Sequence, residues 1–107
     1  MKRDLAKHTY EKGSSLNNYR IFETDQFQKD LQHITKSGQK KVSLKLRDFV
    51  YPQLREHPHF GNNIKKLKGY TPATWRYRIG AWRFFYEIDD EEMIVFLLAA
   101  SHRSVAY

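Results

Sequence analysis

The segment that decides the fold is a short stretch rich in aromatic residues and arginines, Trp75-Arg76-Tyr77-Arg78-Ile79-Gly80-Ala81-Trp82-Arg83-Phe84-Phe85-Tyr86. Apolar residues alternate with arginines on both sides of a Gly-Ala pair, which predicts a β-hairpin with a two-residue turn. Successive side chains of a strand point to opposite faces of a sheet. One face therefore carries the apolar set Trp75, Tyr77, Ile79, Trp82, Phe84 and Tyr86, and the other carries Arg76, Arg78, Arg83 and Phe85.

A turn at Gly80-Ala81 places Arg78 directly opposite Arg83. Like charges facing each other across two strands destabilise a hairpin, whereas a bound phosphate would make the pair favourable. The planar fork of an arginine also matches phosphate geometry. The alternative is a solvated charged face, with one arginine neutralised by Glu87 on the same strand. We favour an anion site.

Two further features of this region allow two interpretations each. Phe85, on the arginine side, either stacks on a nucleobase or packs under a C-terminal segment or a partner. The lysines before the hairpin, Lys65, Lys66 and Lys68, either extend the positive field toward nucleic acid or protect an edge strand from aggregation.

Upstream of the hairpin, the pattern predicts a strand and two helices. Residues 19–23 are aromatic and β-branched, and Thr24 or Asp25 can cap a helix that ends at Gly38. The apolar stripe of this helix is Phe27, Leu31 and Ile34. A second helix is expected from about residue 40 to 51, ended or kinked by Pro52, with a buried face of Val42, Leu46, Phe49 and Val50.

Downstream, the uninterrupted apolar run over residues 93–100 predicts a buried strand, and residues 64–67 predict a short one. The order is β-α-α-β-β-β. We expect an α+β domain over residues 19–107, with two N-terminal helices packed on a twisted antiparallel sheet of three or four strands. Residues 1–18 are expected to form a flexible N-terminal extension.

The composition limits the classes of function that the chain can have. The 107 residues carry a net charge of +7, which favours polyanionic partners, and they include no cysteine, which excludes disulfides and thiol chemistry. We expect no cofactor and no metal. No apolar run approaches the roughly 20 residues of a membrane-spanning helix, so a cytoplasmic protein without a membrane partner is expected.

The tail after the last predicted strand holds His102, Arg103 and Tyr107. An imidazole with an ordinary pKa of about 6.5 suits proton transfer near neutral pH. Arg103 adds a cation, and Tyr107 adds a phenol and a stacking surface. Alternatively, His102 simply caps the end of the strand.

Together these motifs resemble the RelE/ParE toxin superfamily of type II toxin–antitoxin systems. The resemblance rests on Lys66-Leu67-Lys68-Gly69, on the arginine hairpin, on the ending His102-Arg103 with Tyr107, and on the opening strand and helix. It covers roughly residues 19–107 and leaves the N-terminal extension outside. It implies helices packed on a twisted sheet and a cognate antitoxin as partner.

The RelE-like branch of the family implies cleavage of mRNA on the ribosome without a metal, by attack of a ribose 2′-hydroxyl on the adjacent phosphate. By position, Arg83, Arg103 and Tyr107 would be catalytic, and Arg76 and Arg78 would bind RNA. From the residues themselves we add His102 to the catalytic set, and Lys65, Lys66, Lys68 and Phe85 to the RNA-binding set. Some relatives have lysines where Arg76 and Arg78 stand. Because arginine does not deprotonate, we interpret these two as phosphate clamps and favour His102 over Tyr107 as the base.

Two other functions remain open at the level of sequence. One is a ParE-like inhibitor of DNA gyrase without nuclease activity, and the other is a basic RNA-binding or ribosome-associated module without catalysis. Fold alone does not decide among functions that share a fold. The arginines together with His102 and Tyr107 favour an endoribonuclease toxin that inhibits translation.

Overall fold

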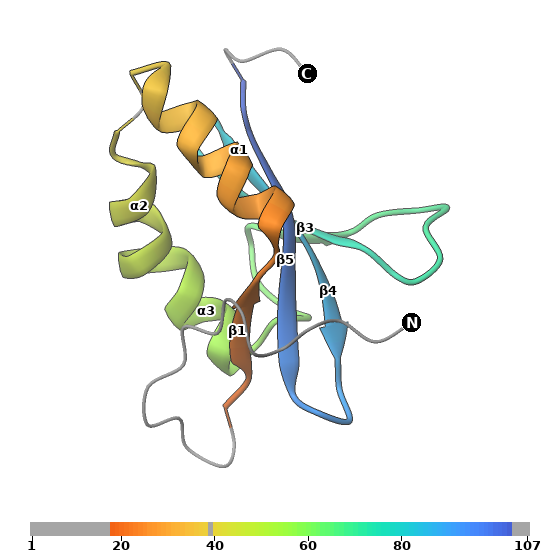
Figure 1. Cartoon of the computed structure of the whole chain (residues 1–107). Helices are drawn as coiled ribbons and strands as arrows, with labels where there is room; N and C mark the ends of the chain where they lie inside the picture. Colours follow the sequence, from red (N-terminus) through yellow and green to blue (C-terminus); the bar gives the residue numbers. More distant parts are fainter. Residues whose placement is uncertain (1–17, 39, 104–107) are drawn as a thin grey trace.

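The computed structural model describes residues 18–38 and 40–103, and it confirms an α+β fold. The predicted N-terminal extension lies outside these residues, apart from Asn18. The elements are β1 (Arg20–Glu23), α1 (Asp25–Lys36), α2 (Val42–Lys45), a π-helical turn η1 (Leu46–Val50), α3 (Tyr51–Glu56), β2 (Ile64–Lys66), β3 (Trp75–Ile79), β4 (Trp82–Asp89) and β5 (Ile94–His102). All helices lie on one side of the sheet (Figure 1).

The sheet differs from the expected one in strand number and direction. Within the described residues it has five strands, in the order β1-β5-β4-β3-β2. The pairs β5–β4, β4–β3 and β3–β2 are antiparallel, but β1 runs parallel to β5. Parallel neighbours need a long crossover, and here the helical segments and the three-stranded meander provide it.

The second helix continues past the point where it was expected to end. Helix α2, η1 and α3 form one continuous segment that passes through Pro52 and ends at Glu56. Proline lacks an amide hydrogen, and the wide η1 turn before it, in which the Tyr51 amide donates to the Leu46 carbonyl, accommodates the ring. The wider turn also rotates the apolar stripe, so Phe49 is 53% exposed instead of buried, whereas Leu54 is fully buried.

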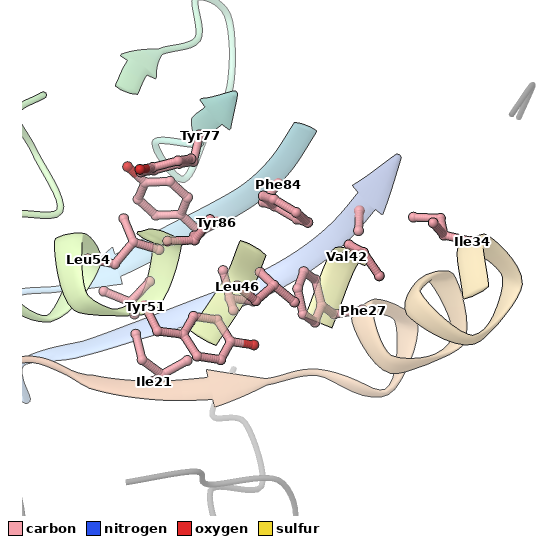
Figure 2. Packing of buried hydrophobic residues seen from close by; sticks show 14 residues of the cluster. Ile21, Phe27, Ile34, Val42, Leu46, Tyr51, Leu54, Tyr77, Phe84 and Tyr86 are labelled. Carbon is pink, nitrogen blue, oxygen red and sulfur yellow. The ribbon is translucent and has the colours of Figure 1, made fainter. Parts of the chain in front are cut away.

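The core lies between the helices and the apolar face of the hairpin. Tyr77, Phe84 and Tyr86 are at most 4% exposed. Figure 2 shows them facing side chains of the helical layer, among them Phe27 and Leu54. The predicted alternation of the hairpin is therefore confirmed, and it fixes the arginines on the opposite, helix-free face.

Helix α1 also fixes the end of β5, which has β4 on one side but no strand on the other. Strand β1 pairs only with Ile94–Leu97 of β5. Beyond that point the Thr24 hydroxyl donates to the Leu97 carbonyl at 2.8 Å, and the buried Asp30 carboxylate accepts from the Ala100 amide at 2.9 Å. Side chains of the helix N-terminus thus take over hydrogen bonds that a further strand residue would make.

Candidate functional site

The β3–β4 hairpin has the register that the sequence predicted. Arg78 lies opposite Arg83 and Ile79 opposite Trp82, with Gly80 and Ala81 in the turn. Gly80 has a φ of 58°, a backbone conformation that glycine adopts without steric cost. The turn therefore holds the two arginines in register.

The helix-free side of this hairpin, which we call the arginine face, presents two rows of side chains across the strands. Its members are Lys65, Arg76, Arg78, Arg83 and Phe85. Lys65 pairs with Arg76, and Arg76 pairs with Phe85, forming the first row. The second row joins Arg78 to Arg83 and then to Ser101 of β5. Residues two apart along a strand place the rows roughly 7 Å apart.

The cations of the arginine face have no carboxylate partner among the residues that the structure describes. Among residues 18–38 and 40–103, no carboxylate forms a salt bridge with Lys65, Arg76, Arg78 or Arg83. The Nε atom of Arg76 is buried and has no hydrogen-bond partner in this part of the chain. A buried donor without an acceptor costs free energy, so within the described residues Arg76 carries an uncompensated donor as well as an unpaired charge.

A pocket of about 470 Å³ opens beside the first row. We call it the phosphate pocket, and its lining includes Lys65, Arg76 and Arg78 together with Asn62, Asn63, Ile64 and Gly80. The Arg78 amide donates to the Asn63 carbonyl at 2.9 Å, which extends the β2–β3 pairing to the rim of the pocket. Guanidinium and amide donors on one wall suit a phosphate group.

Two of the three predicted lysines lie apart from the arginine face. Lys66 pairs with Trp75, and its ammonium lies 5.7 Å from the centroid of that ring, on the helix-facing side of the sheet. Lys68 is exposed in the loop that follows β2. Only Lys65 therefore joins the rows, because alternation along a three-residue strand sends its neighbour to the other face.

The predicted catalytic residues of the chain end do not lie together on one face of the sheet. His102 pairs with Trp82, and their ring centroids are 5.4 Å apart. This places His102 on the helix-facing side, while Ser101 is the residue beside Arg83. The Arg103 amide donates to the Ala81 carbonyl at 2.8 Å, which holds Arg103 at the hairpin turn. Tyr107 lies outside the described residues.

Ser101 is a neighbour of the arginines that sequence reasoning missed. Strand β5 has an irregularity in register where β4 passes from Phe85 to Tyr86, so Phe85 pairs with Ala99 but Tyr86 with Leu97. An apolar run contains no polar residue to show which side chains lie on which face of the sheet. The irregularity also adds one residue to β5, so simple alternation along the strand assigns the wrong face on one side of it. The sequence pattern therefore gave no indication that Ser101 lies beside Arg83.

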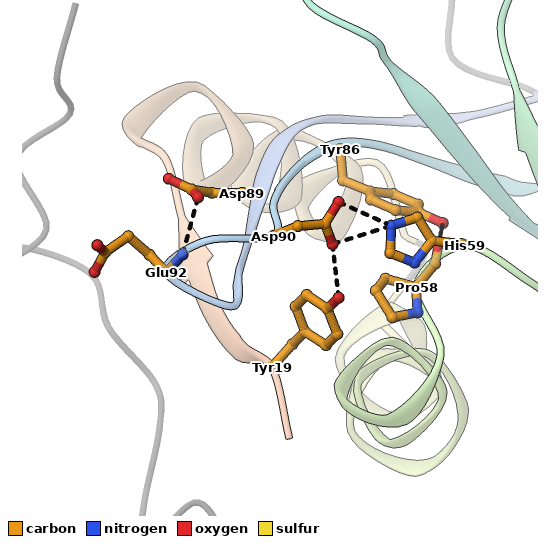
Figure 3. Close-up of polar contacts among 7 residues, drawn as sticks. All are labelled: Tyr19, Pro58, His59, Tyr86, Asp89, Asp90 and Glu92. Atoms are coloured by element: carbon orange, nitrogen blue, oxygen red, sulfur yellow. Dashed lines mark hydrogen bonds and ion pairs between the residues drawn. The ribbon is translucent and has the colours of Figure 1, made fainter. Parts of the chain in front are cut away.

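A second polar cluster lies beyond the far end of β4 (Figure 3). The Tyr19 hydroxyl donates to Asp90 Oδ1 at 2.6 Å, and His59 Nε2 lies 3.1 Å from the same oxygen. The Tyr19 hydrogen bond lowers the pKa of Asp90, and in return it raises the pKa of Tyr19 to about 12. The Tyr86 hydroxyl donates to the Pro58 carbonyl, and burial raises the pKa of Tyr86. These contacts connect loops and are remote from the arginine face.

Within the described residues, no group of three or more His, Asp or Glu side chains could hold a metal ion. No helix in that part of the chain is long and apolar enough to cross a membrane.

Comparison with known proteins identifies the family. The family model described as the ParE toxin of the type II toxin–antitoxin system parDE matches residues 15–107. The chain belongs to this family. It is a toxin of the RelE/ParE superfamily of type II toxin–antitoxin systems. The comparison with curated proteins found no match.

Solved structures of toxin–antitoxin proteins share the fold of this ParE-family chain. A chain of the RelBE2 toxin–antitoxin complex from Mycobacterium tuberculosis is 25% identical, with a TM-score of 0.60, covering 80% of this chain and 99% of that one. A chain of the archaeal RelE–RelB complex from Pyrococcus horikoshii is 25% identical, with a TM-score of 0.54 and coverage of 82% and 98%. A mutant of E. coli toxin RelE in the free state is 19% identical, with a TM-score of 0.56 and coverage of 81% and 85%, which shows the fold alone.

Proposed function

We propose that this toxin is a ribosome-dependent endoribonuclease that cleaves mRNA in the cytoplasm and so inhibits translation. In the proposed reaction the ribose 2′-hydroxyl gives its proton to a base as its oxygen attacks the adjacent phosphorus, and a pentacoordinate intermediate forms. The bond to the 5′-oxygen then breaks as that oxygen receives a proton, which leaves a 2′,3′-cyclic phosphate. No metal is required, because guanidinium groups supply the positive charge. The chemistry needs cations fixed around one phosphate and a group that transfers protons.

The observation that carries this proposal is the uncompensated second row of the arginine face. Arg78 and Arg83 face each other in register, and no carboxylate of the described chain pairs with either. Cations fixed in advance around a phosphate stabilise the charge that develops during the attack. Arg76 and Lys65 of the first row would hold the neighbouring phosphate group, and Arg103 at the turn adds a further cation.

The proton transfer is assigned to the chain end. His102 and Tyr107 are the two candidates, and we favour His102 because an imidazole is the side chain that commonly transfers protons near neutral pH. Its ring lies against Trp82 on the helix-facing side, so it would reach a phosphate only around the end of the sheet near Arg103. Substitution of His102 by phenylalanine tests this assignment directly, because it keeps the ring against Trp82 and removes the imidazole.

The proposal is tested by inducing the toxin in cells and mapping mRNA ends by primer extension. Wild type should arrest translation and produce new 5′ ends within codons. The double variant Arg83→Ala with Arg103→Ala should produce none while it remains folded. Arg47→Ala is the matched control, because Arg47 is exposed on the helical layer and pairs with Asp48. A double variant that cuts mRNA at the wild-type rate would refute the assignment.

The partner that we propose is a cognate antitoxin with an acidic segment. Solved relatives are described as toxin–antitoxin complexes, and a net charge of +7 favours an acidic partner. Such segments often fold on binding. Co-expression with the product of a neighbouring small gene should yield a stable complex and restore growth.

A second function is supported by the family match itself, which is to a ParE toxin. In that case the chain would inhibit DNA gyrase and would not cut RNA. Filamentation and DNA damage after induction, with mRNA left intact, would favour this alternative. The same primer-extension experiment therefore separates the two functions.

A further inference from the structure

An apolar groove of about 420 Å³ lies next to the arginine face. Its floor is formed by Phe85 with Leu98 and Ala99 of β5. Its wall comes from the loop between β2 and β3, which contributes Leu67, Tyr70 and Pro72. This loop projects away from the helical layer (Figure 1), so the groove opens on the side of the sheet that the helices leave uncovered.

We propose that the groove binds a nucleobase of the RNA whose phosphate groups lie on the arginine face. The inference rests on the proposed function and adds to it a base-binding subsite with named side chains. Phe85 is the central contact, because it belongs to the arginine face and also lines the groove.

The first argument is the position of the groove relative to the phosphate pocket. Arg76 lines the phosphate pocket, and Phe85 lines the groove. These two residues pair directly across β3 and β4, and directly opposed residues have Cβ atoms roughly 5 Å apart. A charged pocket and an aromatic groove side by side match a nucleotide, which joins an anionic phosphate to a flat apolar base.

The second argument is the chemistry of the lining. Tyr70 is 58% exposed, so core packing does not account for its position. It adds a second aromatic ring to the lining beside that of Phe85. Proteins commonly bind single-stranded RNA by stacking bases on such rings. The lining also includes Thr71, whose hydroxyl can donate a hydrogen bond to the edge of a base or accept one from it.

The same lining favours RNA over an acidic protein segment. A positively charged toxin attracts an acidic partner, but this groove is lined mainly by apolar side chains, among them Phe85, Leu98 and Ala99, and a carboxylate placed on them would lose its hydration. A neutral base avoids this cost. The cations remain in the neighbouring rows, where the phosphate groups would lie.

The test measures equilibrium binding of the full chain to two labelled probes by fluorescence anisotropy. One probe is a single-stranded RNA hexamer of mixed sequence, and the other is the same ribose-phosphate backbone without bases. Phe85→Ala should weaken binding of the hexamer roughly tenfold, the scale expected for loss of one stacked base, and should leave the abasic probe unchanged. Tyr70→Ala should act in the same direction.

Controls separate this inference from the proposed function. Arg83→Ala should weaken both probes equally, and Phe49→Ala, which removes an exposed aromatic ring from the helical layer, should change neither. Because Tyr70 is exposed, its substitution leaves folding intact, which circular dichroism verifies for every variant.

Three outcomes would overturn the inference. If the hexamer binds in an Arg83-dependent manner but Phe85→Ala and Tyr70→Ala have no effect, the base subsite is refuted and RNA binding stands. The base subsite is also refuted if these two variants weaken binding of an acidic antitoxin peptide and leave RNA binding unchanged. If wild type binds neither probe, the proposed RNA function fails and the groove assignment fails with it.

Discussion

Arg78 and Arg83 lie directly opposite each other across the β3–β4 hairpin, on the sheet face that no described helix covers. Folding gains nothing from this arrangement, because like charges in register repel each other. The structure therefore keeps an unfavourable contact that becomes favourable when a polyanion binds. Functional sites commonly retain such a cost in stability.

The first prediction follows from that cost. Arg83→Thr should raise the free energy of unfolding by up to about 1 kcal/mol, because it removes the repulsion and places a β-branched residue in a strand. Toxicity should be lost in the same variant. Urea denaturation measures the stability, and the gain should shrink at high salt, where surface charges are screened. A clear loss of stability would show that the pair is not repulsive.

The second prediction concerns the salt dependence of RNA binding. Each phosphate contact with single-stranded nucleic acid contributes a slope of about −0.7 to the plot of log K against log salt. Arg76→Ala, Arg78→Ala and Arg83→Ala should each make the slope less steep by about 0.7. Arg47→Ala should leave it unchanged, because Arg47 lies on the helical layer. Equal slopes for all four variants would argue against phosphate contacts on the arginine face.

The third prediction addresses proton transfer. His102→Phe keeps an aromatic ring against Trp82 but removes the titrating imidazole, so cleavage should fall by about 100-fold or more while stability changes little. The rate of single-turnover cleavage as a function of pH measures this. Tyr107→Phe is the companion variant. Full activity of His102→Phe, together with a loss in Tyr107→Phe, would move the proton transfer to Tyr107.

The fourth prediction concerns the support of β5. Asp30→Ala removes the acceptor that the buried Ala100 amide uses, and it should destabilise the fold by about 1–3 kcal/mol. Asp30→Asn retains a carbonyl oxygen at the same position and should cost less. Urea unfolding of the two variants gives the comparison. Equal stability of Asp30→Ala and wild type would mean that α1 does not fix the end of β5.

The fifth prediction is a pH dependence of stability. The pKa of Asp90 is lowered in the folded state. Its contribution to folding stability is therefore fully present above its pKa in the unfolded chain, about 3.9, and is lost as the pH falls through its pKa in the folded protein. The pKa of Tyr19, raised to about 12, means that the stabilisation persists through neutral pH and is lost as the pH rises above about 10.

Tyr19→Phe should therefore lower stability by up to about 1 kcal/mol at pH 7, and the difference from wild type should shrink below about pH 4. Tyr70→Phe is the control, since that tyrosine lies in the loop between β2 and β3. A difference that stays constant between pH 7 and pH 3 would contradict the assigned hydrogen bond. Thermal denaturation at a series of pH values provides the measurement.

The parts of the fold that the sequence predicted well are those with a local signal. Gly80 fixed the turn, and the strict alternation around it fixed both the register and the face of every arginine in the hairpin. The helix over Asp25–Lys36 was recognisable from its Thr24 cap and its apolar stripe. In each case a short stretch carries both the pattern and its boundary.

The parts that escaped prediction depend on contacts between distant residues. Nothing in residues 20–23 indicates a parallel partner more than seventy residues away. The π-helical turn that exposes Phe49 has no sequence signature of its own. Strand β5 is apolar on both faces, so its irregularity in register could not be predicted. His102 lies near the hairpin, as expected, but on the helix-facing side beside Trp82, and Ser101 is the residue opposite Arg83.

The most direct test of the central claim is single-turnover cleavage of ribosome-bound mRNA by purified toxin. Wild type should cut the mRNA, and a 2′-deoxy substitution at the scissile nucleotide should prevent cleavage. Arg83→Ala should slow the reaction by about 100-fold or more, as expected when one group that stabilises the transition-state charge is removed. Cleavage by folded Arg83→Ala at the wild-type rate would contradict the account.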